Sequence, residues 1–343
     1  MSYKQLTLKD LAKQLNTSIT TVSRALKGHY SISESMRTKV LELAKQLDFH
    51  PNPMALNLLK SRSFTIGVIV PEIAHHFYSM VMEGIEETAV AAGYNVMFCA
   101  SKESSEKEED VVNALLQSRI DGLLIAPSKE TINYTHLQNI VNKGMPLIFF
   151  DRHSADLRVS KVLVNDYEGA MQATNHLLEN GCKRIAHIAG PKKLSNSIQR
   201  LHGYKDALKN SRIKIDKDLI AHCNLTKEGV ADCIEKLLSL KNKPDAIFTY
   251  NSFIAFESML LVKRKGYKIP SDICFIGFAN EPVISYIEPQ LTTVLLPAYE
   301  MGQEATKLFL EQINCKTEKY EPKTVTLQAK LIVKESSLKK KAK

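Results

Sequence analysis

The sequence predicts a small all-α unit at the N-terminus, followed by a large α/β core of two doubly wound lobes. Two observations predict the core. Apolar segments typical of buried strands alternate with amphipathic helices through residues 64–338, and this series of strands and helices occurs twice. A third observation predicts the all-α unit, because apolar residues recur at helical spacing in short stretches of the first fifty residues. At 343 residues the chain is too long for one ordinary domain and long enough to bury a substantial core.

Residues 7–28 predict two short helices joined by a tight turn. Thr7 is a candidate N-cap with Asp10 three residues later, and Ser18 is a second candidate N-cap. Gly28 is a candidate C-cap for the second helix. One face of that helix is apolar. The opposite face carries short hydrogen-bonding side chains, one cation and one branched apolar residue: Ile19, Thr20, Ser23 and Arg24.

This polar face suits the major groove of DNA. Arg bridges guanine, hydroxyls reach phosphates or base edges, and an apolar side chain contacts a thymine methyl group. A solvated face on an ordinary helical pair is the alternative, since short helical hairpins are common. A third predicted helix, about Glu34 to Leu47, completes a compact helix-turn-helix unit. Residues 1–62 hold ten Lys and Arg against four Asp and Glu, a net +6 of the whole chain's +9, which favours phosphate contact.

The stretch TLKDLAKQLNTSITTVSRALKG, followed by SISESMRTKVLELAKQLDFHPNP, resembles the DNA-binding head of the lactose-repressor (LacI/GalR) family. The most specific part is TVSRAL at 21–26, and the resemblance continues through the rest of the chain. It implies a helix-turn-helix headpiece before a periplasmic-binding-protein-like (type I) core. The DNA-binding residues expected from the pattern and the resemblance are Thr7, Ser18, Ile19, Thr20, Thr21, Ser23, Arg24, Asn52 and Leu58.

The expected headpiece ends at residue 50 and a link covers 51–63. Asn52 before Pro53 predicts an N-cap followed by a favoured first-position proline. The helix has only about seven residues, so it needs a partner, and a plain linker that touches the next domain is the alternative. The resemblance implies a hinge helix whose two copies, one per subunit, wedge Leu58 into the minor groove. Here Leu59 precedes Lys60, which shifts the expected basic backbone contact by one residue.

The expected effector-binding and dimerisation domain covers 64–338, and a basic tail covers 339–343. A break near 159–165 separates the two lobes, and chain crossovers are expected near 160–165, 290 and 325. The expected strands are 64–71, 94–100, 121–127, 145–151, 162–166, 184–190, 245–250, 273–278, 291–297 and 324–333. The expected helices are 78–92, 107–117, 134–143, 167–179, 199–208, one that ends at 265, and 298–313.

Ligands of open α/β sheets bind beyond the carboxyl ends of the strands, which here face the cleft between the lobes. The candidate effector contacts near these ends are Phe77, Asp151, Arg200, Asn251 and Asn280. Arg200 in QRLHGY matches the family's effector arginine and suits a carboxylate or a diol. Each residue singly serves equally well as a loop polar group or a helix cap. Their convergence on one cleft is what favours a binding site.

Two positions depart from the family's sugar-binding pattern. Relatives that bind sugars usually carry acids where this chain has Ser252 and Ala279, and an acid at 279 would accept hydrogen bonds from sugar hydroxyls. We therefore expect a divergent effector, such as an acidic sugar or sugar phosphate held by Arg200. The alternative is a regulator that has lost its small ligand and responds to a protein.

The expected function is a ligand-responsive transcriptional regulator, most simply a repressor, that binds a near-palindromic operator as a homodimer. Its expected effector is a sugar or sugar derivative that couples to DNA binding through the lobe angle. A transport protein with the same core fold and an enzyme are the rivals. The basic head argues against the first, and the missing phosphate-loop and nucleophile-elbow motifs argue against the second.

Composition sets the remaining expectations. The chain lacks an apolar run of signal-peptide or membrane-span length, so it is expected to be cytoplasmic and associated with the bacterial nucleoid. The six cysteines form no C-x-x-C pair and are expected to be reduced thiols. We expect no metal and no cofactor. The tail has no heptad repeat, so no coiled coil is expected there.

Overall fold

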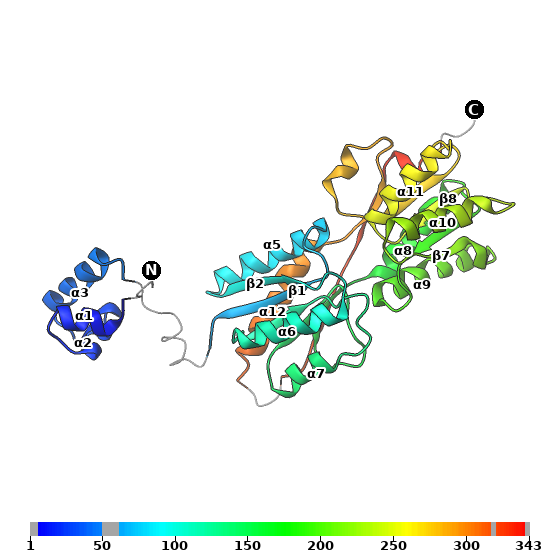
Figure 1. The fold of residues 1–343 in the computed structure, drawn as a ribbon. Coiled ribbons are helices and arrows are strands. Elements are labelled where there is room, and N and C mark those ends of the chain that lie inside the picture. The colour runs from blue at the N-terminus through cyan, green and yellow to red at the C-terminus, as the bar shows by residue number, and fades with distance from the viewer. Residues whose placement is uncertain (1–5, 50–61, 317–319, 340–343) are drawn as a thin grey trace. The chain divides into compact units, whose positions relative to one another are not determined.

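The computed structural model describes residues 6–49, 62–316 and 320–339. The chain divides into two units, residues 1–64 and 65–343 (Figure 1). Within residues 6–49 the first unit has three helices, and the described part of the second contains two six-stranded sheets with their helices. This architecture confirms the predicted fold class. Within the described parts of the chain, no helix is long and apolar enough to cross a membrane.

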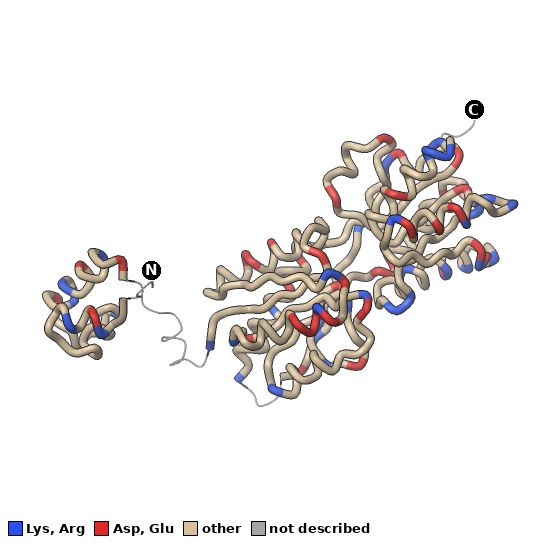
Figure 2. Tube along the Cα trace, viewed as in Figure 1, with Lys and Arg blue, Asp and Glu red and all other residues tan. Residues whose placement is uncertain are grey.

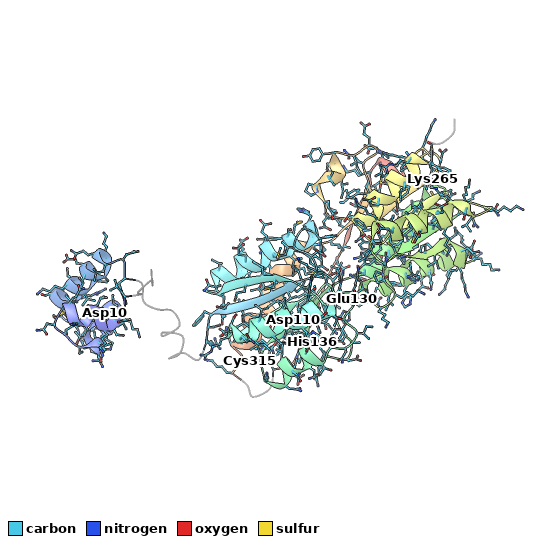
Figure 3. The ribbon with its side chains drawn as sticks, viewed as in Figure 1. Asp10, Asp110, Glu130, His136, Lys265 and Cys315 are labelled. Carbon is cyan, nitrogen blue, oxygen red and sulfur yellow. The ribbon has the colours of Figure 1, made fainter. Side chains whose placement is uncertain are left out.

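The headpiece helices are α1 (Leu8–Gln14), α2 (Ile19–Leu26) and α3 (Glu34–Gln46). The Asp10 carboxylate, labelled in Figure 3, accepts the backbone N–H of Thr7 at 2.9 Å. Ser18 Oγ accepts the N–H of Thr21 at 3.0 Å, and Ser33 Oγ accepts the N–H of Met36. Each helix is followed by a residue with positive φ, which turns the chain sharply: Asn16, Gly28 and Asp48.

Three apolar side chains, one from each helix, close the headpiece core. Leu11, Val22 and Val40 are fully buried, and small alanines fill the space around them. Phe49, which the sequence placed in the approach to the link, is also buried in this cluster. The apolar face of α2 is therefore committed to the core, which leaves its polar face outside.

The first lobe of the core is a parallel sheet in the order β11-β5-β4-β3-β1-β2. Its strands are β1 (Thr65–Val70), β2 (Asn95–Ala100), β3 (Gly122–Ile125), β4 (Leu147–Phe150), β5 (Ser160–Val164) and β11 (Thr324–Leu327). The helices that pack on it are α5 (His76–Ala91), α6 (Ser105–Gln117), α7 (Thr135–Asn142) and α12 (Ala298–Ile313). Figure 1 shows these elements as one lobe of the core unit.

The second lobe repeats this plan in the order β12-β10-β9-β8-β6-β7. Its strands are β6 (Ile185–Ala189), β7 (Ile220–His222), β8 (Ala246–Thr249), β9 (Cys274–Phe278), β10 (Thr292–Leu295) and β12 (Lys330–Ile332). Its helices are α8 (Asp166–Glu179), α9 (Ser195–Asn210), α10 (Lys227–Ser239) and α11 (Ser252–Arg264), with short 3-10 turns η1 (Lys217–Leu219), η2 (Pro282–Ser285) and η3 (Glu335–Ser337). Only the last strand, β12, runs antiparallel to its neighbour among the described pairings.

Three connections join the lobes. The first passes through Asn165 and the third through 328–329, and these two are tied together because the Asn165 N–H donates to Leu327 O at 2.9 Å. The second lies at 296–297, later than the expected crossover near 290. This difference arises because β10 still pairs with β9 in the second sheet before the chain crosses.

Candidate functional site

The headpiece presents the polar face of α2 to solvent. Ser18, Thr20 and Arg24 are exposed, and Ile19 keeps 47% of its surface accessible although it is apolar. Thr21 and Ser23 are partly buried at the edges of this face, and Thr7 is exposed before α1. Two further predicted DNA contacts, Asn52 and Leu58, lie outside the described residues.

The described headpiece has an excess of positive charge. Residues 6–49 contain seven Lys and Arg against four Asp and Glu. Figure 2 colours their positions along the trace. Arg37 from α3 is a further cation that the sequence pattern did not single out. Its guanidinium lies beside Gly28, where an added Cβ would be 3.3 Å from Nη2, so it sits at the C-terminal end of α2. The headpiece thus combines exposed hydrogen-bonding groups with positive charge.

In the core unit, a cavity of about 350 Å³ lies between the two lobes. Asp151 follows β4, Asn251 follows β8 and Asn280 follows β9, so all three lie beyond strand ends. Phe77 from the start of α5 and Arg200 from α9 complete the expected set. The structure therefore brings all five predicted effector residues to one cavity.

Asp151 connects the two lobes through a chain of hydrogen bonds. Its carboxylate accepts the hydroxyl of Tyr78 at 2.8 Å and, from the other lobe, the side-chain amide of Asn196 at 3.1 Å. Asn196 in turn accepts the hydroxyl of Tyr250 at 2.9 Å. Burial raises the pKa of Tyr250 to about 12, so this hydroxyl stays protonated at neutral pH and remains a donor.

Arg200 is almost fully buried and already holds a carboxylate of its own chain. Its Nε and Nη2 both lie 2.7 Å from Asp166 Oδ1, and Nη1 donates to the Tyr250 carbonyl oxygen. The guanidinium carbon lies 3.7 Å from the centroid of the Phe278 ring, a cation–π contact. Burial raises the pKa of Asp166 to about 6, and Arg200 opposes this rise. The expected partner of an anionic effector is thus paired internally.

Asn251 and Asn280 line the cavity but use their side chains locally. Asn251 Oδ1 accepts the N–H of Ile254 and caps α11. The Asn280 amide makes two bonds to the backbone of Leu296, at 2.7 Å to its carbonyl oxygen and 3.2 Å from its N–H. Asn280 therefore holds the start of the second lobe connection, and Asn251 retains only its NH₂ group for a ligand.

Charges in the cleft balance. Arg152 forms a two-pronged ion pair with Glu103, at 2.8 and 2.9 Å, under the cavity wall. Burial raises the pKa of Glu103, but Arg152 and Lys129 together outweigh burial and hold the pKa below its ordinary value. The lining residues include four cations, Lys102, Lys129, Arg152 and Arg200, and three acids, Glu72, Glu103 and Asp151. Asp166, which pairs with Arg200, is a fourth acid at the site. The cavity therefore carries no excess positive charge.

An acid does stand near the two positions where the sequence pattern lacks one. Glu281 accepts hydrogen bonds from the Ser252 hydroxyl and, at 3.1 Å, from the Asn280 N–H. It also lies 3.7 Å from Nε2 of His75, which belongs to the other lobe. Burial lowers the pKa of His75, although Glu281 opposes this shift. A carboxylate from residue 281 thus lies beside Ser252 and Asn280, although Glu281 does not line the cavity.

The predicted set left out further residues that line the cavity, among them Tyr78, Arg152, Asn196 and Tyr250. Three of these four are immediate neighbours of predicted residues, so the strand-end rule found the correct segments but not every side chain that faces the cleft. Asn196 was missed because the helix was expected to begin at 199, whereas α9 begins at Ser195.

Comparison with known proteins places this geometry in a family. Residues 7–52 match the model described as bacterial regulatory proteins, lacI family. Residues 63–335 match the model for periplasmic binding proteins and the sugar binding domain of the LacI family. The chain belongs to the LacI family. It is a transcriptional regulator, as its curated relatives are.

Known proteins similar to this LacI-family chain span nearly its whole length. The transcriptional repressor CytR of Escherichia coli K12 is 33% identical over 90% of this chain and 89% of its own. A solved complex of the transcriptional regulator CelR with cellobiose is 26% identical, covers 97% of this chain and all of that one, and has a TM-score of 0.74. A lac repressor dimer bound to operator shares the fold, with a TM-score of 0.84 at 23% identity over 98% of this chain and all of that one.

Proposed function

We propose that this LacI-family regulator is a repressor that binds operator DNA as a homodimer, and that an uncharged sugar or sugar derivative in the inter-lobe cleft sets its operator affinity. The single observation that carries the effector class is the internal ion pair between Arg200 and Asp166. An anion would have to displace a carboxylate that is already desolvated and bound. A neutral polyol instead meets hydrogen-bonding groups with aromatic rings beside them.

The DNA-binding part rests on the exposed face of α2. One headpiece offers too few base-contacting side chains for a long site, so two copies on a near-palindromic site are the natural arrangement. Arg24 is proposed to read a base edge, and the other contacts of the α2 face are Ser18, Ile19, Thr20, Thr21 and Ser23. Thr7, Asn52 and Leu58 are proposed to position the protein on the duplex and at its centre.

The proposed effector contacts begin with Asp151. Its oxygens already accept bonds from both lobes, so a sugar hydroxyl that replaces or joins Asn196 would change how the lobes meet. Phe77 supplies an apolar wall for the ring of a sugar, and Asn251 supplies a donor. Arg200 and Asn280 act chiefly by holding these groups and the lobe connection in place.

The experiment is fluorescence anisotropy of the full chain on an operator selected from randomised DNA, at fixed salt. It is titrated with neutral mono- and disaccharides and with charge-matched pairs such as glucose and glucuronate. We expect at least one neutral sugar to shift operator affinity by about tenfold, or 1.4 kcal/mol of coupling, and the acidic partner to have a much smaller effect at pH 7.5. Preference for the acid would refute the assignment, and no response to any sugar would favour a protein effector.

The pH dependence of anion binding follows from Asp166. Its folded pKa of about 6 means that the carboxylate takes up a proton as the pH falls below 6, which leaves Arg200 without its counter-ion. Glucuronate should therefore bind up to about tenfold more tightly at pH 5 than at pH 7.5, measured by calorimetry. The Asp166→Asn variant should bind glucuronate with an affinity that no longer depends on protonation of residue 166. Because His75 also titrates in the cleft, only the part of the pH dependence lost in Asp166→Asn is assigned to Asp166.

A further inference from the structure

Two cysteines of the second lobe face each other behind the inter-lobe cleft. Cys223 directly follows β7, and Cys233 lies on α10, which packs against that strand. Their thiols are in hydrogen-bond contact, and Cys233 Sγ also lies 3.7 Å from the carbonyl oxygen of His222. Both side chains are buried in the same apolar cluster.

The surroundings stabilise a thiolate at Cys223. The Cys233 thiol and the backbone N–H groups of Leu225 and Thr226 lower the pKa of Cys223 to about 7, although burial opposes them. The Leu225 N–H lies 3.4 Å from Cys223 Sγ. The same contact raises the pKa of Cys233, so the two sulfurs share one proton.

A surface hollow reaches Cys233 of this pair but not the buried Cys223. It has a volume of about 350 Å³, and its other lining residues are Ala221, His222, Asn224, Gly229, Asp232 and Lys236. A molecule as small as a peroxide fits such a space. The second thiol pair of this lobe, Cys182 and Cys274, is also in hydrogen-bond contact and buried, but neither residue lines this hollow. The Cys182 and Cys274 pair is therefore a matched control for oxidation of Cys223 and Cys233.

The loop after Cys223 belongs to the cleft. Leu225 lines the cavity and has a positive φ of 67°, a conformation that leucine rarely adopts. The carbonyl oxygen of Asn224 accepts the ammonium group of Lys129 from the other lobe at 3.1 Å. A change at Cys223 therefore moves both a cavity wall and a contact between the lobes.

We propose that Cys223 and Cys233 form a reversible disulfide on exposure to a peroxide, and that this bond rearranges the 223–226 loop at the cleft. The Cys233 sulfur, which lines the hollow, passes its proton to the Cys223 thiolate and attacks one peroxide oxygen; an S–O bond forms as the O–O bond breaks, and the first water leaves. The Cys223 sulfur then attacks the Cys233 sulfur, the S–O bond breaks as the S–S bond forms, and the second water leaves. The peroxide is reduced by two electrons, and the protons of both thiols end in the waters. Any reducing dithiol reverses the bond.

Peptide mapping tests the chemistry without reference to any effector. Full-length protein carrying Cys315→Ser, which removes an exposed thiol, is treated with hydrogen peroxide, alkylated and digested with trypsin. Cleavage after Lys217, Lys227 and Lys236 puts the two cysteines in separate peptides, 218–227 and 228–236. We expect these two to be linked and to lose two hydrogens in total. Cys233→Ser and Cys233→Ala should abolish the link, whereas Cys182→Ser should keep it.

A link between the Cys182 and Cys274 peptides instead, or complete alkylation of all four thiols, would overturn the proposal. The effect on the cleft rests on the proposed function and is measured separately. Oxidation should change the apparent Kd of the responsive sugar by about fivefold or more, and dithiothreitol should restore it. A mapped disulfide with an unchanged Kd would refute the coupling to the cleft. If no sugar binds in either redox state, the proposed effector fails while the disulfide stands.

Discussion

Replacing Arg24 by alanine is expected to weaken binding to the selected operator by about 1–3 kcal/mol, a loss of roughly five- to 150-fold. Arg24 is exposed at the end of α2, and no side-chain partner is seen for it within residues 6–49, so its guanidinium is available to DNA. A two-pronged contact to guanine discriminates between sequences. Binding to non-specific DNA should therefore change much less, as measured by anisotropy on both duplexes at the same salt concentration.

Two further variants separate base reading from charge. Arg24→Lys keeps the positive charge but cannot form the planar fork, so it should lose most of the specificity. Lys13→Ala removes an exposed cation from α1 and should weaken both duplexes alike, with a smaller salt dependence. Equal losses on operator and non-specific DNA for Arg24→Ala would show that Arg24 contacts only the backbone.

Local patterns predicted most elements of the fold. The helix expected at 298–313 has those bounds in α12, and the apolar run at 64–71 contains β1. The sequence interpretation omitted β7 and α10, whose short strand and polar approach carry a weak pattern. It also began α9 too late, because Ser195, Asn196 and Ser197 have the composition of a loop and become helical only through their burial in the second lobe.

The site was predictable as a place but not as a set of interactions. The ends of parallel strands must meet at one edge, so the positions of Asp151 and Asn251 followed from topology. The pairing of Arg200 with Asp166 joins residues 34 positions apart through tertiary packing, which no local pattern encodes. We expected an anionic effector because no sequence pattern indicated a partner for Arg200. Its counter-ion, Asp166, lies in the first turn of the preceding helix, α8.

Arg200→Met should lower the free energy of unfolding at pH 8 by about 3–5 kcal/mol, because it leaves Asp166 buried without a counter-ion. Urea denaturation followed by circular dichroism measures this loss. The double variant Asp166→Leu with Arg200→Met removes both charges and should recover most of the stability. Both variants should fail to respond to the effector, so loss of response in the stable double variant cannot be attributed to unfolding.

The pH dependence of the free energy of unfolding distinguishes an unpaired buried charge from a loss of packing. In the native chain Asp166 has a folded pKa of about 6, above its unfolded value, so its favourable contribution is present at low pH and is lost as the pH rises through 6. Arg200 lowers this pKa, and its removal pushes the folded pKa higher still. Between pH 6 and 8, Arg200→Met should therefore lose a further 1.4 kcal/mol or so per pH unit relative to the native chain. The double variant should lack this slope, and a stability loss in Arg200→Met that is the same at pH 6 and pH 8 would mean that Arg200 stabilises the lobe by packing alone.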